Sequence, residues 1–145
     1  MTIRGKTLLA LPVRLHGIQL ARPIDLLLDR EELKVLGLHL RCGDGVDRFL
    51  PLPAASVRED EIAIQSPLVM LEEDQLAFYR SRAFALSSLR GRSVERRRRE
   101  VGLLDDVVFS GDGTLQELVV TTQGHEERLP FDETVRIVLE SRSAA

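Results

Sequence analysis

A run of four consecutive arginines at residues 96–99 is the stretch whose residue types most directly suggest chemistry. Eight arginines and one acid give residues 80–99 a net charge of +7, whereas the whole 145-residue chain carries −3. A guanidinium group presents a planar fork of donors that matches carboxylate and phosphate groups. We expect residues 96–99 to lie at a strand end or hairpin tip, with two side chains on each face. The predicted partner-binding residues are Arg90, Arg92, Arg96, Arg97, Arg98 and Arg99.

Three interpretations of this basic segment remain open. In the first, it is a solvated loop whose positive charge is balanced by residues 100–145, which carry ten acids and three arginines. In the second, it binds acidic groups of a partner protein. In the third, it binds RNA. RNA is disfavoured because the isoelectric point is near 5.7 and no aromatic residues are interleaved with the run.

The adjacent acids Asp105 and Asp106 suggest a metal or acid–base site. Neighbouring side chains of a strand point to opposite faces, so we expect these two carboxylates to diverge and to have a structural role. Residues 110–113 (Ser-Gly-Asp-Gly) and 42–45 (Cys-Gly-Asp-Gly) are too short to hold a phosphate and lack a following helix or lysine. Both are predicted to be hairpin turns.

The other chemically versatile residues are dispersed. His16, His39 and His125 stand in three separate segments without the paired spacing of a zinc site. Cys42 is the single cysteine, and it is expected to be an inert thiol. We therefore predict no catalytic residue, no cofactor and no metal, and a protein that is not an enzyme.

The elements that carry these residues are predicted to be short antiparallel strands. Apolar runs at 103–109, 115–121 and 128–131 are separated by turn signals at 110–113 and 123–124. Earlier strands are expected at 11–20, with a bend at Gly17, and at 23–28, 35–40, 48–52 and 62–64.

The first half of the chain repeats the pattern of the second. Asp25 corresponds to Asp105 at 80 positions, and Leu50 corresponds to Leu129 at 79. Residues 15–20 match residues 89–94 at 74 positions, so the arginine run is expected to fill six additional residues of the second copy. Two copies of one small β module are predicted.

An apolar connector joins the two copies. Residues 66–88 include the only tyrosine and two of the five phenylalanines, with early acids that suit the start of a short helix. We expect this connector to wedge between the modules. The predicted boundaries are 8–66 for the first module, 67–88 for the connector and 89–141 for the second module.

No run approaches the roughly 20 apolar residues of a membrane span, and no signal-peptide core is present. An apolar fraction of 43% with 30% charged residues is typical of a globular protein. The expected location is the cytoplasm.

The turn and core positions resemble the PRC-barrel family. The residues that carry this resemblance are a glycine in the first strand (Gly17, Gly91), Val-Gly-Leu-Leu-Asp-Asp-Val-Val at 101–108, the Asp-Gly turn, and Arg-Leu-Pro-Phe at 128–131. The family is named for the cytoplasmic part of the reaction-centre H subunit, and a related barrel forms the C-terminal half of the ribosome-maturation factor RimM. The resemblance covers nearly the whole chain as two tandem copies.

The resemblance implies a mostly β fold of two small tandem PRC-like barrels and no shared catalytic residues. We predict a non-enzymatic interaction or scaffold protein that docks a partner protein or associates with itself. The alternative is a ribosome- or RNA-associated factor that binds through residues 90–99. Neither specific role of the two relatives transfers, because fold alone does not determine function.

Overall fold

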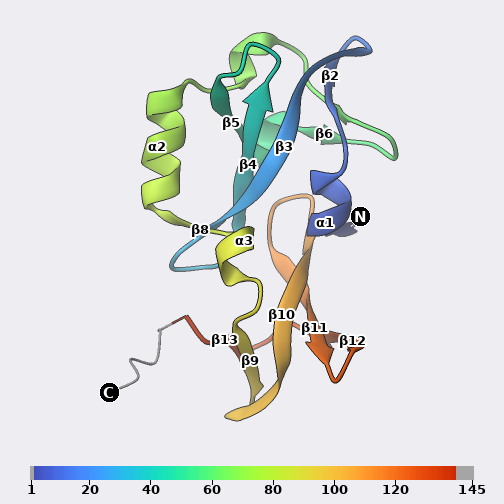
Figure 1. Ribbon diagram of the computed structural model, residues 1–145, viewed down its shortest axis with the longest axis vertical. Helices are drawn as coiled ribbons and strands as arrows, with labels where there is room; N and C mark the ends of the chain where they lie inside the picture. Colours follow the sequence, from blue (N-terminus) through green and yellow to red (C-terminus); the bar gives the residue numbers. More distant parts are fainter. Residues whose placement is uncertain (1, 140–145) are drawn as a thin grey trace.

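The computed structural model describes residues 2–139 and shows two β-sheets, one above the other along the long axis (Figure 1). The first sheet has the order β5 (Asp47–Pro51), β4 (Val35–Cys42), β3 (Ile18–Asp29), β2 (Val13–Leu15), β7 (Ile62–Ala63) and β6 (Ser56–Val57), with β8 (Ala83–Ala85) against β3. The second has the order β12 (His125–Pro130), β11 (Leu115–Thr122), β10 (Arg99–Ser110), β9 (Ser93–Arg96) and β13 (Val135–Ile137), with β1 (Thr2–Arg4) against β10. A mostly β fold is thereby confirmed.

Neither sheet closes on itself through the strand pairs of residues 2–139, so the two closed barrels stay a prediction. The pairs are antiparallel, apart from the parallel pair of β2 with β7. Short helices complete the chain: α1 (Gly5–Leu9), η1 (Leu52–Ala54), η2 (Pro67–Val69), α2 (Glu73–Ser81) and α3 (Leu86–Leu89).

The two halves exchange their first strands. β1 precedes the first sheet in the chain, yet it pairs with β10 of the second, with Ile3 opposite Phe109. Reciprocally, β8 precedes the second sheet and pairs with β3 of the first, with Phe84 opposite Leu28. Residues 2–4 lie before the predicted first module, and residues 83–85 lie inside the predicted connector. Each half therefore needs the other to complete its sheet.

The long strands β3 and β10 show which positions of the two halves correspond in the structure. Each has 12 residues, and they lie 81 positions apart with register shifts at equivalent places. One of these shifts separates Pro23 from Asp25, and its counterpart separates Leu104 from Asp106. Asp25 therefore corresponds to Asp106, and the predicted match with Asp105 is wrong by one residue, because each strand carries a β-bulge that local similarity does not reveal.

The segment predicted as one strand at residues 11–20 is a hairpin. His16 and Gly17 have φ angles of 49° and 81°, and this left-handed backbone reverses the chain between β2 and β3. Its counterpart 81 positions later is Arg97-Arg98, between β9 and β10. The arginine run is thus not an insertion of six residues. The sequence match had equated Gly17 with Gly91, which lies just after α3 instead.

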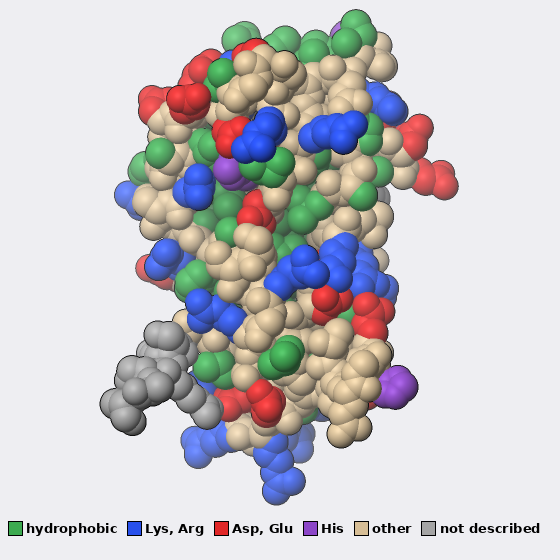
Figure 2. All heavy atoms as spheres, in the orientation of Figure 1, with side chains coloured by type: hydrophobic (Ala, Val, Ile, Leu, Met, Phe, Trp, Pro, Cys, Tyr) green, Lys and Arg blue, Asp and Glu red, His purple; other side chains and the backbone are tan. Residues whose placement is uncertain are grey.

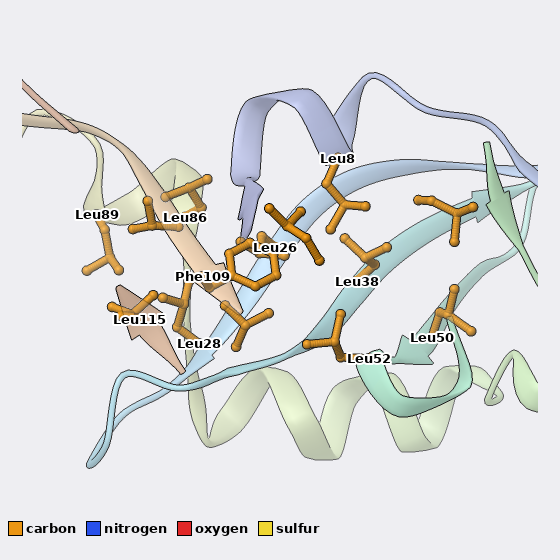
Figure 3. Close-up of a cluster of buried hydrophobic side chains, with 14 of the residues drawn as sticks. Leu8, Leu26, Leu28, Leu38, Leu50, Leu52, Leu86, Leu89, Phe109 and Leu115 are labelled. Atoms are coloured by element: carbon orange, nitrogen blue, oxygen red, sulfur yellow. The ribbon is translucent and has the colours of Figure 1, made fainter. Parts of the chain in front are cut away.

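One continuous core joins the two halves (Figure 3). Phe109 of β10 is fully buried, and the close-up shows its ring beside Leu26 and Leu28 of β3. Each such side chain contributes about 1.5–3 kcal/mol of burial free energy. The exchange of strands and this shared core hold the two halves together.

The predicted helix of the connector is confirmed as α2. Acids in its first turn and Arg80 in its last turn suit the helix dipole. Leu76 packs with Leu27 and Phe49, and the ring of Tyr79 stacks on that of Phe49 at 4.3 Å. α2 therefore covers the first sheet, whereas Leu86, near the end of the predicted connector, and Leu89, just after it, belong to the core that joins the two halves.

Candidate functional site

The β9–β10 hairpin presents the arginine run at one end of the long axis (Figures 1 and 2). Arg96 ends β9, Arg99 begins β10, and the two are cross-strand partners. We call Arg96, Arg97, Arg98 and Arg99 the arginine tip. The predicted location at a strand end or hairpin tip is confirmed.

The backbone of the arginine tip is strained. Arg97 and Arg98 have φ angles of 51° and 69°, which is the left-handed region at both positions of a two-residue turn. Asn-Gly is the pair that such a turn favours, and a residue with a Cβ costs roughly 1–2 kcal/mol in this region. Arg96 and Arg99 are like charges directly opposite each other, which is also destabilising. Two unfavourable features thus coincide at one turn.

The four guanidinium groups of the arginine tip are exposed and have no hydrogen bond or ion pair with any residue of the range 2–139. The charges of the arginine tip act on the carboxyl group of Asp132. Its pKa is lowered mainly by hydrogen bonds from Thr134, with further contributions from the charges of Arg96 and Arg97. The donors of the tip therefore face solvent.

A hollow of about 490 Å³ adjoins the arginine tip and adds a further arginine. Glu95 is 8% exposed and accepts a hydrogen bond at 2.8 Å from Nε of Arg136, which stands opposite it on β13. Nη2 of Arg136 forms an ion pair with the same carboxylate oxygen at 2.8 Å. The backbone N–H of Arg97 donates to the carbonyl oxygen of Thr134 at 2.9 Å. These contacts hold Thr134 and the adjoining β13 against one side of the hairpin. The sequence had not indicated Glu95 or Arg136, because their pairing is long-range.

Arg90 and Arg92 differ from the arginine tip, because both interact with their own chain. Nη2 of Arg90 lies 3.4 Å from Oδ1 of Asp105. Arg92 donates to the carbonyl oxygens of Ser88, Val138 and Leu139. The structure therefore separates the six predicted residues into four solvent-facing arginines and two that tie segments of the fold together.

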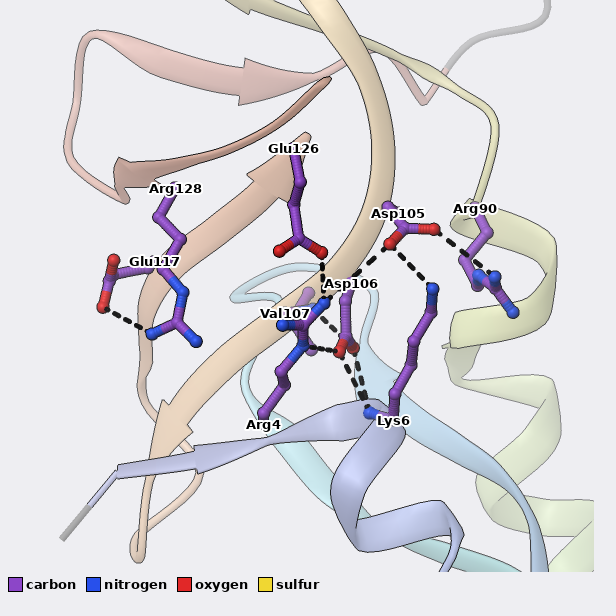
Figure 4. Close-up of polar contacts among 9 residues, drawn as sticks. All are labelled: Arg4, Lys6, Arg90, Asp105, Asp106, Val107, Glu117, Glu126 and Arg128. Carbon is purple, nitrogen blue, oxygen red and sulfur yellow. Dashed lines mark hydrogen bonds and ion pairs between the residues drawn. The ribbon is translucent and has the colours of Figure 1, made fainter. Parts of the chain in front are cut away.

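Asp105 and Asp106 converge on the N-terminal segment, contrary to the prediction that they diverge (Figure 4). Oδ2 of Asp106, which is fully buried, accepts from Nε of Arg4 at 2.8 Å and from the backbone N–H of Lys6 at 3.1 Å. Oδ2 of Asp105 accepts from Nζ of Lys6 at 2.7 Å. The β-bulge between Leu104 and Asp106 breaks the alternation on which the prediction rested.

These contacts agree with the structural role that was predicted for the two acids. The hydrogen bond from Lys6, followed by that from Arg90, holds the pKa of Asp105 below its ordinary value. Nη2 of Arg4 also reaches Glu126 of β12 at 2.5 Å. We call this cluster a latch, because its hydrogen bonds and ion pairs hold β1 and α1 against the second sheet.

A smaller, reciprocal latch exists in the other half. Asp25, the counterpart of Asp106, accepts from the backbone N–H of Ser87 at 3.2 Å and from its hydroxyl group. Ser87 of α3 and Lys6 of α1 lie 81 positions apart, so each half provides an aspartate that caps the short helix of the other.

The remaining candidates form no reactive cluster. Cys42 is buried, and residues 42–45 and 110–113 form the predicted hairpin turns. Nε2 of His39 is 2.9 Å from Asp47, whereas His16 and His125 lie on separate hairpins. Within residues 2–139, no group of three or more His, Cys, Asp or Glu side chains is arranged to hold a metal ion.

No helix among the described residues 2–139 is both long and apolar enough to cross a membrane. No protein-family model and no curated protein matches the chain. The resemblance to the PRC-barrel family accordingly stays a prediction.

Proposed function

We propose that the protein is a non-enzymatic docking module, built from two PRC-barrel-like copies, that binds an acidic surface of a partner protein through its arginine tip. One observation carries the proposal: four exposed guanidinium groups, which have no hydrogen-bond or ion-pair partner among residues 2–139, stand on a turn whose backbone favours Asn-Gly. Backbone strain that no local packing offsets is typical of functional sites.

The geometry favours carboxylate groups over an RNA backbone. The hollow beside the arginine tip is lined by Glu95 and Glu133 as well as by arginines, so its charge is mixed. A protein surface whose carboxylates are spaced among other residues can pair them with the arginines and keep them away from the two glutamates. An RNA backbone carries a negative phosphate at every nucleotide and therefore has less freedom to avoid them. No aromatic side chain is among the residues that line the hollow, although stacking is a main source of affinity for single-stranded RNA.

Binding to two defined probes tests the proposal. We would measure fluorescence anisotropy with an Asp/Glu-rich peptide and with a single-stranded RNA of equal net charge. The test variant is Arg97→Glu/Arg98→Glu. The matched control is Arg22→Glu/Arg80→Glu, which changes the same amount of charge at two exposed arginines without an ion pair in the described range.

We expect the peptide to bind more tightly than the RNA, and the test variant to weaken peptide binding at least about tenfold, or about 1.4 kcal/mol. The control variant should retain most of the affinity. Tighter RNA binding with a steep dependence on salt would favour the RNA-associated alternative. If the protein binds neither probe, or if both variants lose affinity equally, the proposal is wrong.

A further inference from the structure

A partly apolar groove lies at the end of the protein opposite the arginine tip. It has a volume of about 870 Å³ and is formed by the β4–β5 turn, by η2 and by the beginning of α2. Leu20, Met70 and Leu71 contribute apolar lining, and Leu68 at its border is 87% exposed. Such an exposed leucine next to a groove is a feature of contact surfaces.

The rim of this groove is acidic. Glu72 and Asp74 line it, and Glu73 stands between them in the sequence. All three are exposed and have no ion pair with the described residues 2–139. Asp44 also lines the groove, but Nη2 of Arg48 neutralises it at 2.9 Å. The free charge at this end of the protein is therefore negative.

The elements that form the groove and the hairpin that carries the arginine tip lie at opposite ends of the longest axis (Figure 1). The space-filling view shows basic side chains at the extreme lower end, and acidic side chains at the upper end together with some basic ones (Figure 2). One molecule thus carries two complementary surfaces that point away from each other. Neither surface is able to reach the other within the same chain.

We propose that the groove binds the arginine tip of a second copy of this chain, so that the molecules associate head to tail. This inference rests on the proposed docking role of the arginine tip and names a partner for it. Arg97 and Arg98 of one copy would pair with Glu72 and Asp74 of the next. Their aliphatic stems would cover Leu68, because arginine packs its methylene groups on apolar surface while its charged end stays hydrated.

The symmetry of this contact has a direct consequence. Two different surfaces meet, so the interface is heterologous, and every added copy leaves one free tip and one free groove. Association therefore proceeds beyond a dimer into open chains or closed rings. It should weaken as salt increases, because exposed charges beyond a Debye length of about 10 Å at 0.1 M are screened.

A charge-swap experiment tests the inference with the full chain. One variant reverses the tip (Arg97→Glu/Arg98→Glu) and the other reverses the groove (Glu72→Lys/Asp74→Lys). Sedimentation velocity across a wide range of protein concentration, at low and high salt, gives the mass of each variant and of their equimolar mixture. Far-UV circular dichroism verifies that both variants are folded.

We expect the wild type to form species larger than a dimer at low salt, and each variant alone to remain monomeric. The mixture should assemble again, because each tip then meets a groove of opposite charge. A wild type that stays monomeric, variants that still assemble, or a mixture that does not assemble would each overturn the inference. Peptide binding by the groove variant is independent of self-association, so the proposed docking function is able to survive that result.

Discussion

Two hairpin tips at opposite ends of the protein have the same backbone and different chemistry. The β2–β3 turn has positive φ angles at His16 and Gly17, and the β9–β10 turn has them at Arg97 and Arg98. Next to the first turn stands Ile18, which is 66% exposed, and the counterpart of Ile18 is Arg99. The two turns share their geometry because the strand pairing of the two halves is similar, whereas their exposed side chains differ because no packing constrains them.

The comparison also shows where each copy carries a specialised surface. Gly17 tolerates the left-handed backbone of the first tip. The tip with four arginines has backbone strain and repulsion between like charges instead. The aspartate caps differ in the same way, since Asp106 is fully buried and has a basic side-chain partner, whereas Asp25 bonds only neutral groups. The second half therefore holds both the stronger latch and the more distinctive surface.

The largest effect is expected at the two caps. Asp106→Ala should lower the free energy of unfolding by about 3 kcal/mol, because Nε of Arg4 and the backbone N–H of Lys6 both lose a buried acceptor. Asp25→Ala should lower it by only about 1 kcal/mol, which is typical of a lost helix cap. Urea denaturation measures both values. Equal losses would contradict the view that the two latches differ in strength.

A smaller, opposite effect is expected at the two tips. Arg97→Asn/Arg98→Gly should raise the free energy of unfolding by about 1–2 kcal/mol, because it provides the residue pair that the turn favours. The control His16→Asn should change stability by only a few tenths of a kcal/mol, since Gly17 already occupies the second position of that turn. Thermal and urea unfolding provide the measurement. If the double variant gains no stability, the turn is not strained.

The smallest effect concerns acid pH at the β4–β5 hairpin of the first half. The hydrogen bond from Arg41, followed by that from His39, lowers the pKa of Asp47 from its ordinary 3.8 to about 2. As the pH falls, the Asp47 carboxylate takes up a proton in the unfolded chain before it does so in the folded protein. The contribution of Asp47 to the free energy of unfolding is therefore complete above pH 4 and disappears as the pH falls through 2.

We therefore expect the stability difference between the wild type and Asp47→Asn to shrink from pH 4 toward pH 2. Urea unfolding at several pH values measures this difference, and NMR titration of the Asp47 carboxyl group gives its pKa directly. A pKa near 3.8 would show that neither Arg41 nor His39 holds the charged form. In the second half, the corresponding residue of β12 is Glu126, which contacts Arg4 of the exchanged strand instead.

Local patterns in the sequence were sufficient for many of the elements, but not for β1, β8, α1 and α3, nor for the hairpin within residues 11–20. Short β-branched and leucine-rich runs between glycine turns predicted the strands, the early acids at residues 72–74 predicted α2, and the arginine run was correctly expected at a hairpin tip. These features depend on periodicity, turn residues and charge, which act over a few neighbouring residues. Their location could therefore be inferred without any knowledge of the tertiary structure.

Only the tertiary structure decided which strands exchange and which charges meet. β1 has three residues and no periodicity, so nothing in its sequence indicates that it pairs with β10 across the molecule. The β-bulge turns Asp105 and Asp106 toward the N-terminal segment, and long-range pairing separates Arg90 and Arg92 from the arginine tip. Such contacts depend on the arrangement of distant segments in space, because a residue's own neighbours do not specify the partner that folding brings to it.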